Sequence, residues 1–391
     1  MSKLDMLRGA IDEIDSQIVH LFERRMSVTR QVGEYKREIG MPVLDNGRQR
    51  EVLESKAAMV QDPQLKTGVS LLYETIMGIS RRQQREIVRE GAEEPNYARF
   101  AEAWKKRREP LKNPRVIFQG EKGAYSEEAA RHFFGSDADI RGVHQFENVF
   151  RAIQNGEADY GVVPIENNST GAIRQVYDLL AEYEFHLVGE TTVQVEHCLM
   201  APKGASLDTI THVYSHEQGL FQSEKFLNTH PDWVGTPMAD TAGSAKYVAE
   251  CGDISKAAIC SARAAELYGL EILVRGTNYS NINTTRFVVV SPKIEMREGA
   301  DKISTIVTTP HESGCLHEIL TIFAVNGLNM VKLESRPIQG RSWDYMFFIE
   351  FTGNLEAPGM DGVLHELAQT AGEFRILGNF RTNLEHEYDL C

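Results

Sequence analysis

The sequence lacks the features of exported and membrane-spanning proteins. No run of about 18 apolar residues occurs, so no membrane span is expected. The first residues, MSKLDMLRGAIDEID, carry charges where a signal peptide has an apolar segment, so no secretory signal is expected either. Cysteine is rare: there are five, and no two have the C-x-x-C spacing. We therefore expect reduced thiols in a cytoplasmic protein, with neither a disulfide framework nor a metal site.

An excess of positive charge is also absent. The 391 residues contain 42 Lys+Arg and 56 Asp+Glu, a net charge of −14, which argues against a nucleic-acid partner. Residues 1–90 are an exception, since their 15 Lys+Arg and 14 Asp+Glu give a net charge of +1. An anionic small molecule can therefore bind in this segment, although the chain as a whole is acidic.

Few glycines interrupt the first 90 residues, and Pro42 and Pro63 are the only prolines there. Both lie where the apolar period breaks, so residues 1–92 are expected to form an all-α domain. The predicted helices cover about 3–39, 46–60 and 65–90. The charged segment 93–113 contains two prolines and is expected to be a linker that can include a short helix.

From Arg115 onward, short β-rich runs alternate with helical stretches. This alternation predicts an α/β domain at 114–292, with mainly parallel sheets in two small lobes. The expected strands are 116–118, 160–165, 186–195, 211–215, 257–260 and 286–290. The expected helices are 126–134, 146–155, 171–183, 217–228, 241–251 and 261–268.

Residues 301–391 are expected to form a third, α+β domain. Its elements follow the order βαββαβ, which is the ferredoxin-like split motif. The expected strands are 303–309, 329–338, 344–351 and 374–380, and the expected helices are 314–326 and 360–371.

The first helix carries an apolar stripe with one exception. In a heptad reading, ten of the eleven core positions are apolar or aromatic, over about 36 residues or roughly 50 Å of helix. These positions are Leu4, Leu7, Ile11, Ile14, Ile18, Leu21, Arg25, Val28, Val32, Tyr35 and Ile39. The short neighbouring helices cannot cover such a stripe, so we expect a homodimer or a higher oligomer.

Arg25 is the exception, and a buried guanidinium requires an anion or strong acceptors. Arg8 and Lys36 lie on the adjacent row of the helix. Arg25 and Lys36 are eleven residues apart, about three turns, so they project from nearly one face. They can line one cavity if another helix adds ligands between them. The alternative is that Arg25 only fixes the pairing of the helices, as a lone polar core residue often does.

The motifs of this segment resemble those of the all-helical chorismate mutase family over its full length. They are LRGAIDEID, FERRMSVTRQVGEYK, PVLDNGRQRE and SRRQQ. The resemblance implies that Arg25, together with Arg8 of a partner chain, binds the two carboxylates of chorismate. Lys36 and Gln84 would donate hydrogen bonds to the ether oxygen. Charge develops on that oxygen as the C–O bond breaks, so these donors stabilise the transition state without a cofactor.

The same resemblance implies four further substrate-binding residues. Arg48 and Ser80 would support the carboxylate sites, and Asp45 would contact the hydroxyl group. Gln49 departs from the family, because many members have Glu at this position. The loss of a carboxylate there is expected to change the pH dependence of the reaction.

Three polar segments stand out in the α/β domain. GEKGAYSEEAA (120–130) is Gly-rich and opens a helix at Ser126, a candidate N-cap; a bare turn explains its glycines better than an anion site does. VVPIENNSTGAI (162–173) leads a buried strand into Glu166 and Asn167, where α/β sheets usually bind ligands. NTTRFVVV (283–290) places Thr285 and Arg286 at a strand start, where an arginine is also common as a solvated edge residue.

Jointly, VVPIEN, YSHEQ (214–218) and TRF (285–287) resemble prephenate dehydratase. The resemblance implies two lobes like those of periplasmic binding proteins, with the active site in the cleft. Thr285 would be the general acid that protonates the departing hydroxyl group of prephenate. Arg286 would hold a carboxylate. Glu166, Asn167, Ser215 and Gln222 would line the same cleft.

The C-terminal domain resembles the ACT regulatory domain. Glu334-Ser335-Arg336-Pro337 matches the ESRP signature of phenylalanine-sensitive dehydratases. A second signature, Gly-Ala-Leu-Val, here reads Gly314-Cys315-Leu316-His317, so two of its residues are kept. The resemblance implies effector binding at Gly314, Leu316, Glu334, Ser335 and Arg336, with Gly314 opening a helix whose N–H groups face a carboxylate.

Together the motifs imply a bifunctional enzyme that converts chorismate to prephenate and prephenate to phenylpyruvate, with phenylalanine as feedback inhibitor. Two other interpretations remain open from the residues alone. One is a non-enzymatic amino-acid sensor built on the two-lobed fold. The other keeps the dehydratase chemistry but replaces prephenate with arogenate.

Overall fold

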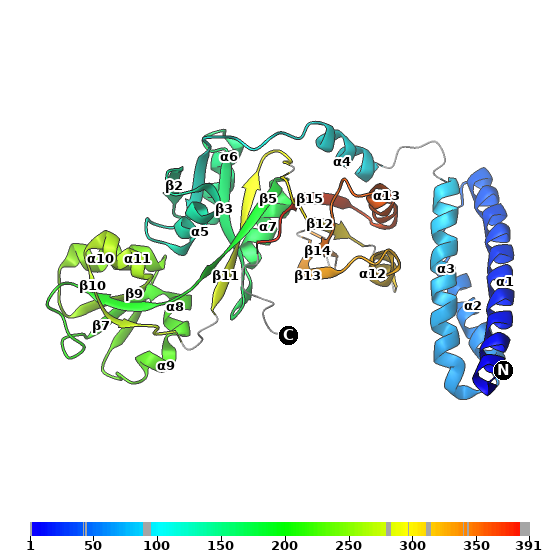
Figure 1. Cartoon of the computed structure of the whole chain (residues 1–391), viewed down its shortest axis with the longest axis horizontal. Helices are drawn as coiled ribbons and strands as arrows, with labels where there is room; N and C mark the ends of the chain where they lie inside the picture. The colour runs from blue at the N-terminus through cyan, green and yellow to red at the C-terminus, as the bar shows by residue number, and fades with distance from the viewer. Residues whose placement is uncertain are drawn as a thin grey trace. The chain divides into compact units, whose positions relative to one another are not determined.

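The computed structural model describes most of the chain (Figure 1). The described residues are 2–41, 43, 45–88, 95–278, 283–295, 297–309, 314–338, 340–341 and 344–383. They group into two compact units, which are described separately. One unit comprises residues 1–99, 309–327 and 362–373, and the other comprises the remainder. No helix within the described residues is both long enough and apolar enough to cross a bilayer.

The three helices predicted at the N-terminus are confirmed. They are α1 (Lys3–Ile39), α2 (Asn46–Met59) and α3 (Lys66–Val88), with a short 3-10 turn before α3. A capping box opens α1, because the Ser2 hydroxyl accepts from the Asp5 N–H and the Asp5 carboxylate accepts from the Ser2 N–H. Gly40 ends the helix in the left-handed conformation, with φ of 66°.

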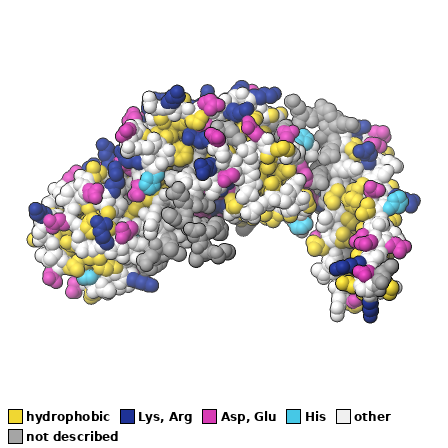
Figure 2. Space-filling model, in the orientation of Figure 1, with side chains coloured by type: hydrophobic (Ala, Val, Ile, Leu, Met, Phe, Trp, Pro, Cys, Tyr) yellow, Lys and Arg dark blue, Asp and Glu magenta, His cyan; other side chains and the backbone are white. Residues whose placement is uncertain are grey.

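Helix α1 uses a different face against α3 from the one that carries the apolar stripe. Gly33 is buried against α3, where a Cβ atom would lie only 3.2 Å from the Cα of Gln84. The ten apolar and aromatic residues of the stripe remain exposed, and Figure 2 shows hydrophobic side chains on the surface of the N-terminal helices. Within one chain, the stripe is thus left without a covering element among the described residues.

The α/β region forms two lobes, each with its own sheet. The first sheet has the order β2-β1-β3-β11-β5 with β4 beside β3, and the second has the order β10-β6-β9-β7-β8. The first-lobe strands are β1 (Arg115–Gln119), β2 (Asp139–Val143), β3 (Tyr160–Asn167), β4 (Gly171–Ala172), β5 (His186–Gln194) and β11 (Thr284–Ser291). The second-lobe strands are β6 (Cys198–Ala201), β7 (His212–His216), β8 (Val234–Met238), β9 (Lys256–Cys260) and β10 (Glu271–Arg275).

Helices flank both sheets, close to their predicted positions. They are α5 (Tyr125–Phe134), α6 (Phe146–Gln154), α7 (Arg174–Glu182), α8 (Glu217–Gln222), α9 (Glu224–Leu227), α10 (Thr241–Cys251) and α11 (Ala262–Tyr268). The helix expected at 217–228 is divided at Ser223. The linker segment contains a further helix, α4 (Pro95–Lys105).

The prediction of mainly parallel sheets is wrong, because both sheets are mixed. Strand β1 runs parallel to β2 and β3, whereas β11 runs antiparallel to both β3 and β5. The reason is topological. The chain leaves the first lobe after β5, builds the second lobe, and returns as β11 between two strands that were formed earlier.

The predicted order βαββαβ is confirmed for the C-terminal residues. The elements are β12 (Lys302–Thr308), α12 (Cys315–Val325), β13 (Met330–Pro337), β14 (Tyr345–Thr352), α13 (Met360–Thr370) and β15 (Phe374–Phe380). The strands form an antiparallel sheet in the order β13-β14-β12-β15, as in ferredoxin-like folds.

This sheet shares one hydrophobic core with the first lobe. Phe348 of β14 packs edge-on against Tyr177 of α7, with ring centroids 4.8 Å apart. Leu377 and Phe380 of β15 belong to the same buried cluster as Leu187 of β5. The C-terminal sheet and the first lobe are therefore one packed body.

Candidate active sites

Arg25 is half-buried between α1 and α3. Its Nη1 donates to the Oγ of Ser80 at 2.5 Å, and Ser80 itself is buried. Burial lowers the pKa of Arg25 from its usual value. Within the described part of the chain, no carboxylate lies at ion-pair distance from this guanidinium, so its remaining N–H donors are left for a ligand.

Lys36 and Gln84 lie on the same two helices as Arg25 and Ser80. The Nζ of Lys36 donates to the carbonyl oxygen of Val43 at 2.6 Å. The Oε1 of Gln84 is buried and has no hydrogen-bond partner among the described residues. A buried amide without a partner is costly unless a ligand satisfies it.

The residues at the start of α2 are more exposed. The Asp45 carboxylate caps this helix by accepting from the N–H of Arg48 at 2.9 Å. Arg48 pairs with Glu51 at 2.7 Å, and both side chains are about two-thirds exposed. The Oε1 of Gln49 accepts from Arg81 at 2.9 Å. Arg8 is exposed, seventeen residues before Arg25 and so roughly 25 Å away along α1.

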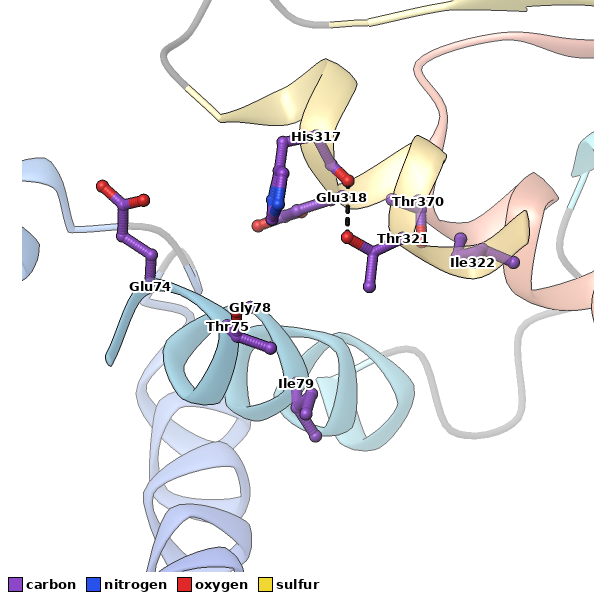
Figure 3. Close-up of a pocket in the computed structure, with 9 residues that line it drawn as sticks. All are labelled: Glu74, Thr75, Gly78, Ile79, His317, Glu318, Thr321, Ile322 and Thr370. Atoms are coloured by element: carbon purple, nitrogen blue, oxygen red, sulfur yellow. Dashed lines mark hydrogen bonds between the residues drawn. The ribbon is translucent and has the colours of Figure 1, made fainter. Parts of the chain in front are cut away.

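A small pocket is lined by other residues than these mutase candidates. Figure 3 shows the residues that line it: Glu74, Thr75, Gly78 and Ile79 of α3, His317, Glu318, Thr321 and Ile322 of α12, and Thr370 of α13. Beside the pocket, Glu318 pairs with Arg81. The pocket contains none of the predicted catalytic side chains.

Thr285 and Asn167 face one another on neighbouring strands of the first lobe, and both are buried. The Nδ2 of Asn167 donates to the Thr285 Oγ1 at 2.9 Å and to the Asn283 Oδ1 at 2.8 Å. Its Oδ1 accepts from the Ser169 hydroxyl at 2.7 Å. Because the Thr285 hydroxyl accepts from Asn167, its own proton remains available for donation.

The second lobe joins this network through Gln222. Its Oε1 accepts from the Nδ2 of Asn283 at 3.0 Å, and its Nε2 donates to Ser169 at 3.2 Å. The same Oε1 lies 2.8 Å from the Nε2 of His197, so this ring nitrogen carries the proton. The Nδ1 of His197 lies 3.2 Å from the Tyr125 hydroxyl. Burial lowers the pKa of His197 to about 4, so the imidazole is neutral at pH 7.

Sequence reasoning missed Tyr125, Ser169, His197 and Asn283. Ser169 and Asn283 lie within the polar segments 162–173 and 283–290, so a test of every polar residue in those segments could have found them. Tyr125 lies within the Gly-rich segment, where only Ser126 was selected. His197 directly precedes β6, a strand that was not predicted, and no local pattern distinguishes it.

Two expectations for the α/β region do not fit the structure. Ser215 does not join the network, because its hydroxyl donates to the carbonyl oxygen of Ile259 at 2.7 Å inside the second lobe. Ser126 is not an N-cap, because α5 begins at Tyr125. The glycines before α5 form a turn, in which the N–H of Gly123 donates to the carboxylate of Glu127 at 2.6 Å.

Glu166 and Arg286 do not line the same cleft as Thr285. Neighbouring residues of a strand point to opposite faces of the sheet. The Nη1 of Arg286 lies 2.7 Å from Glu350 and 3.0 Å from Glu190, both buried. Burial alone lowers the pKa of Arg286, but these two carboxylates outweigh it and hold the pKa above its usual value. The expected role of Arg286 in holding a substrate carboxylate therefore does not fit.

The ESRP residues of β13 divide between the two faces of that strand. Arg336 makes two hydrogen bonds to Asp178 of α7, at 2.9 and 2.7 Å. Glu334 shares the face of Arg336, whereas Ser335 lies on the opposite, exposed face. Gly314 is the N-cap of α12 with φ of 90°, and Leu316 lies in the first turn of that helix.

The helical domain has a half-buried arginine without a carboxylate partner among the described residues, and the α/β domain has a polar network at the junction of its two lobes. These features define an enzyme with two separate sites. Family models agree with this division: chorismate mutase type II matches residues 7–85, and prephenate dehydratase matches residues 116–295. The bifunctional chorismate mutase/prephenate dehydratase of Escherichia coli (strain K12) is 32% identical over 378 residues, which cover 95% of this chain and 94% of that protein. The Aquifex aeolicus (strain VF5) enzyme of the same name is 28% identical and covers 99% of this chain and 100% of that protein.

Two solved structures resemble the region beyond the helical domain. The prephenate dehydratase of Arthrobacter aurescens in complex with L-Phe has a TM-score of 0.63 and 29% identity, and covers 68% of this chain and 89% of that chain. GqqA, described as a novel type of quorum quenching acylase, has a TM-score of 0.63 and 30% identity, and covers 69% of this chain and 98% of that chain. The chain belongs to the family of bifunctional chorismate mutase/prephenate dehydratases. It rearranges chorismate to prephenate and converts prephenate to phenylpyruvate with loss of water and carbon dioxide.

Proposed function

We propose that the mutase site is completed by a second copy of the chain. The supporting observation is Arg25, a half-buried guanidinium whose polar partner among the described residues is the Ser80 hydroxyl. Arg25 binds one carboxylate of chorismate, and Arg8 of the second copy binds the other, since bidentate arginines hold carboxylates in a fixed geometry. The exposed apolar stripe of α1 is the surface that the two copies bury.

The other mutase candidates act around these two arginines. Arg48 and Ser80 support the carboxylate sites, and Asp45 contacts the substrate hydroxyl group. Lys36 and Gln84 donate hydrogen bonds to the ether oxygen, where negative charge grows as the C–O bond breaks. Gln49 remains on the edge of the site, held by Arg81. No nucleophile, metal or cofactor takes part in this mechanism.

In the dehydratase site, Thr285 is the general acid for the departing hydroxyl group. Its hydroxyl accepts from Asn167 and so keeps a proton to donate. A threonine hydroxyl is a weak acid, and the buried network of Asn167, Asn283 and Gln222 fixes its position. Decarboxylation then yields the aromatic ring, which supplies the driving force.

The C-terminal βαββαβ domain is an ACT domain that binds phenylalanine and lowers the dehydratase rate. Three observations support this proposal: the ferredoxin-like strand order, the ESRP sequence on β13, and the L-Phe complex of the Arthrobacter aurescens relative. Gly314, Leu316, Glu334 and Ser335 contact the effector. Arg336 is already paired with Asp178, so it connects the effector domain to the dehydratase instead.

Within the described residues four cysteines are free thiols, which is typical of a cytoplasmic protein.

One assay tests the whole proposal. The purified chain is incubated with chorismate, and loss of chorismate absorbance and formation of phenylpyruvate are followed with and without phenylalanine. Arg25→Ala should abolish the first step and spare the second on added prephenate. Loss of both activities in a folded Arg25→Ala chain would contradict the two-site model.

A further inference from the structure

Six charged side chains meet between the first-lobe sheet and the C-terminal sheet. We call them the inter-sheet charge cluster: Glu166 of β3, Glu190 of β5, Arg286 of β11, Lys302 of β12, Lys332 of β13 and Glu350 of β14. Three are cations and three are anions. Their ion pairs measure 2.7 Å for Arg286–Glu350, Lys302–Glu190 and Lys332–Glu166, 3.0 Å for Arg286–Glu190 and 3.5 Å for Arg286–Glu166.

Four members of the cluster are buried, whereas the side chain of Glu166 is 37% exposed and that of Lys332 is 11% exposed. Glu190, Lys302 and Glu350 are each at most 3% exposed, and Arg286 is 8% exposed. Removing Glu350 leaves Arg286 with Glu190 and Glu166, but the cluster then carries one uncompensated positive charge in a poorly solvated place, which is unfavourable. We expect Arg286 and its strand to shift toward the remaining carboxylates or toward water.

That backbone also carries the dehydratase candidates. On the ladder between β3 and β11, Thr285 lies opposite Asn167, and Arg286 lies opposite Glu166. Because side chains alternate between faces, the first pair points into the polar network and the second into the charge cluster. Each pair is joined to the other by single rigid peptide units, so a shift of Arg286 or Glu166 also moves Thr285 or Asn167.

A bulge lies next to the cluster on the ladder between β11 and β3. The register of these strands changes between Arg286 and Phe287, directly after the Arg286–Glu166 pair. A bulge interrupts the regular hydrogen bonding of a ladder and re-aims the side chains next to it. On its other side, β11 pairs with β5 without interruption from Thr284 to Val289, so the ion pairs of Arg286 and Glu166 add to backbone pairing in holding this end of β3 and β11.

We propose that Glu350 and Lys332 of the C-terminal sheet are positioning residues for the dehydratase reaction. Acting through Arg286 and Glu166, they hold Thr285 and Asn167 in their reactive geometry. The dehydratase site is then completed by residues that lie more than 40 positions beyond its own TRF motif. This inference rests on the proposed role of Thr285.

The test compares Glu350→Gln with Glu356→Gln in the full-length chain. The control removes a carboxylate of the same segment from an exposed ion pair, in which Arg107 and Glu356 are 39% and 55% exposed. We expect Glu350→Gln to lower kcat for prephenate at least about tenfold, with KM within about twofold. Glu356→Gln should stay within about twofold of the parent. The mutase rate of each preparation reports that the helical domain is folded, and circular dichroism with urea unfolding reports the same for the rest of the chain.

A double-mutant cycle with Arg286→Met separates positioning from general loss of stability. If Glu350 acts through Arg286, the kcat of the double variant is about equal to that of the single variant with the lower kcat. Multiplicative effects, an unchanged kcat, or a change confined to KM would overturn the proposal. Should Glu350→Gln lose mutase activity as well, Lys332→Met decides: a fall in kcat supports the proposal, and the parent kcat overturns it. Thr285→Ala is assayed in parallel, and full activity there refutes the general acid, whatever Glu350 does.

Discussion

Arg8 and Arg25 lie on one helix but are too far apart to reach the same substrate. Seventeen residues separate them, so roughly 25 Å of rigid helix lies between their Cα atoms. The proposed site therefore takes Arg8 from the partner. Arg8→Ala and Arg25→Ala should each lose two charge-assisted hydrogen bonds, at about 1.5–3 kcal/mol each. The mutase rate should fall at least about 100-fold in either variant.

Mixing the two inactive variants should restore activity. After subunit exchange, about half of the dimers carry one chain of each kind, and each such dimer contains one intact site. That site combines Arg25 of the Arg8→Ala chain with Arg8 of the Arg25→Ala chain. The mixture should therefore reach about a quarter of the parent mutase rate.

The assay follows chorismate absorbance after the variants are mixed under conditions that allow exchange. Two different affinity tags, purified in sequence, establish that mixed dimers have formed. The dehydratase rate on added prephenate serves as the control, because neither arginine belongs to that site. Mixed dimers that stay at the rate of the single variants would refute a shared site and would confine Arg8 to another role.

Three further predictions concern the other two domains. Thr285→Ala should lower the dehydratase rate at least about 100-fold while sparing the mutase, and Thr285→Ser should keep more activity because it retains the hydroxyl group; an unchanged rate would remove Thr285 from the mechanism. His197 has a folded-state pKa of about 4, below its value in the unfolded chain, so the unfolded state binds more protons at acid pH. The free energy of unfolding should therefore keep its full value above about pH 6.5 and fall as the pH drops toward 4. Urea unfolding should show that His197→Gln loses less of this free energy than the parent across that window. Equal losses in the two proteins would assign the effect to other groups. Phenylalanine should lower the parent dehydratase rate, and Glu334→Ala should weaken this inhibition. Unaltered inhibition in Glu334→Ala would mean that the effector does not bind at β13.

Local patterns predicted the elements far better than they predicted what the side chains touch. The long apolar period of α1 and the break at Pro42 are strong signals, and the helices are confirmed. Strands β2, β4, β6, β8 and β10 were missed. Each has five residues or fewer, and except in β6 none of their residues is fully buried, so the apolar pattern along them is weak.

The dehydratase site was predicted in part, for a physical reason that Arg286 illustrates. The TRF motif identified Thr285, the residue before Arg286. Its contact with Asn167 could be anticipated, because both residues lie at strand ends in one sheet. The partners of Arg286 could not be anticipated, since Glu190 and Glu350 lie 96 and 64 residues away in the chain. Thr285 and Arg286 point to opposite faces of the sheet because side chains alternate along β11. Which of them faces the polar network depends on the register of the strand.

The contact between β15 and β5 leaves no room for a side chain at Gly378, where a Cβ atom would overlap the Leu187 carbonyl oxygen. A gene shortened after Ser291 would thus encode a first lobe whose apolar face, normally covered by the C-terminal sheet, is exposed to water. Biotechnologists who want an unregulated enzyme should keep the whole tail and alter single effector contacts instead.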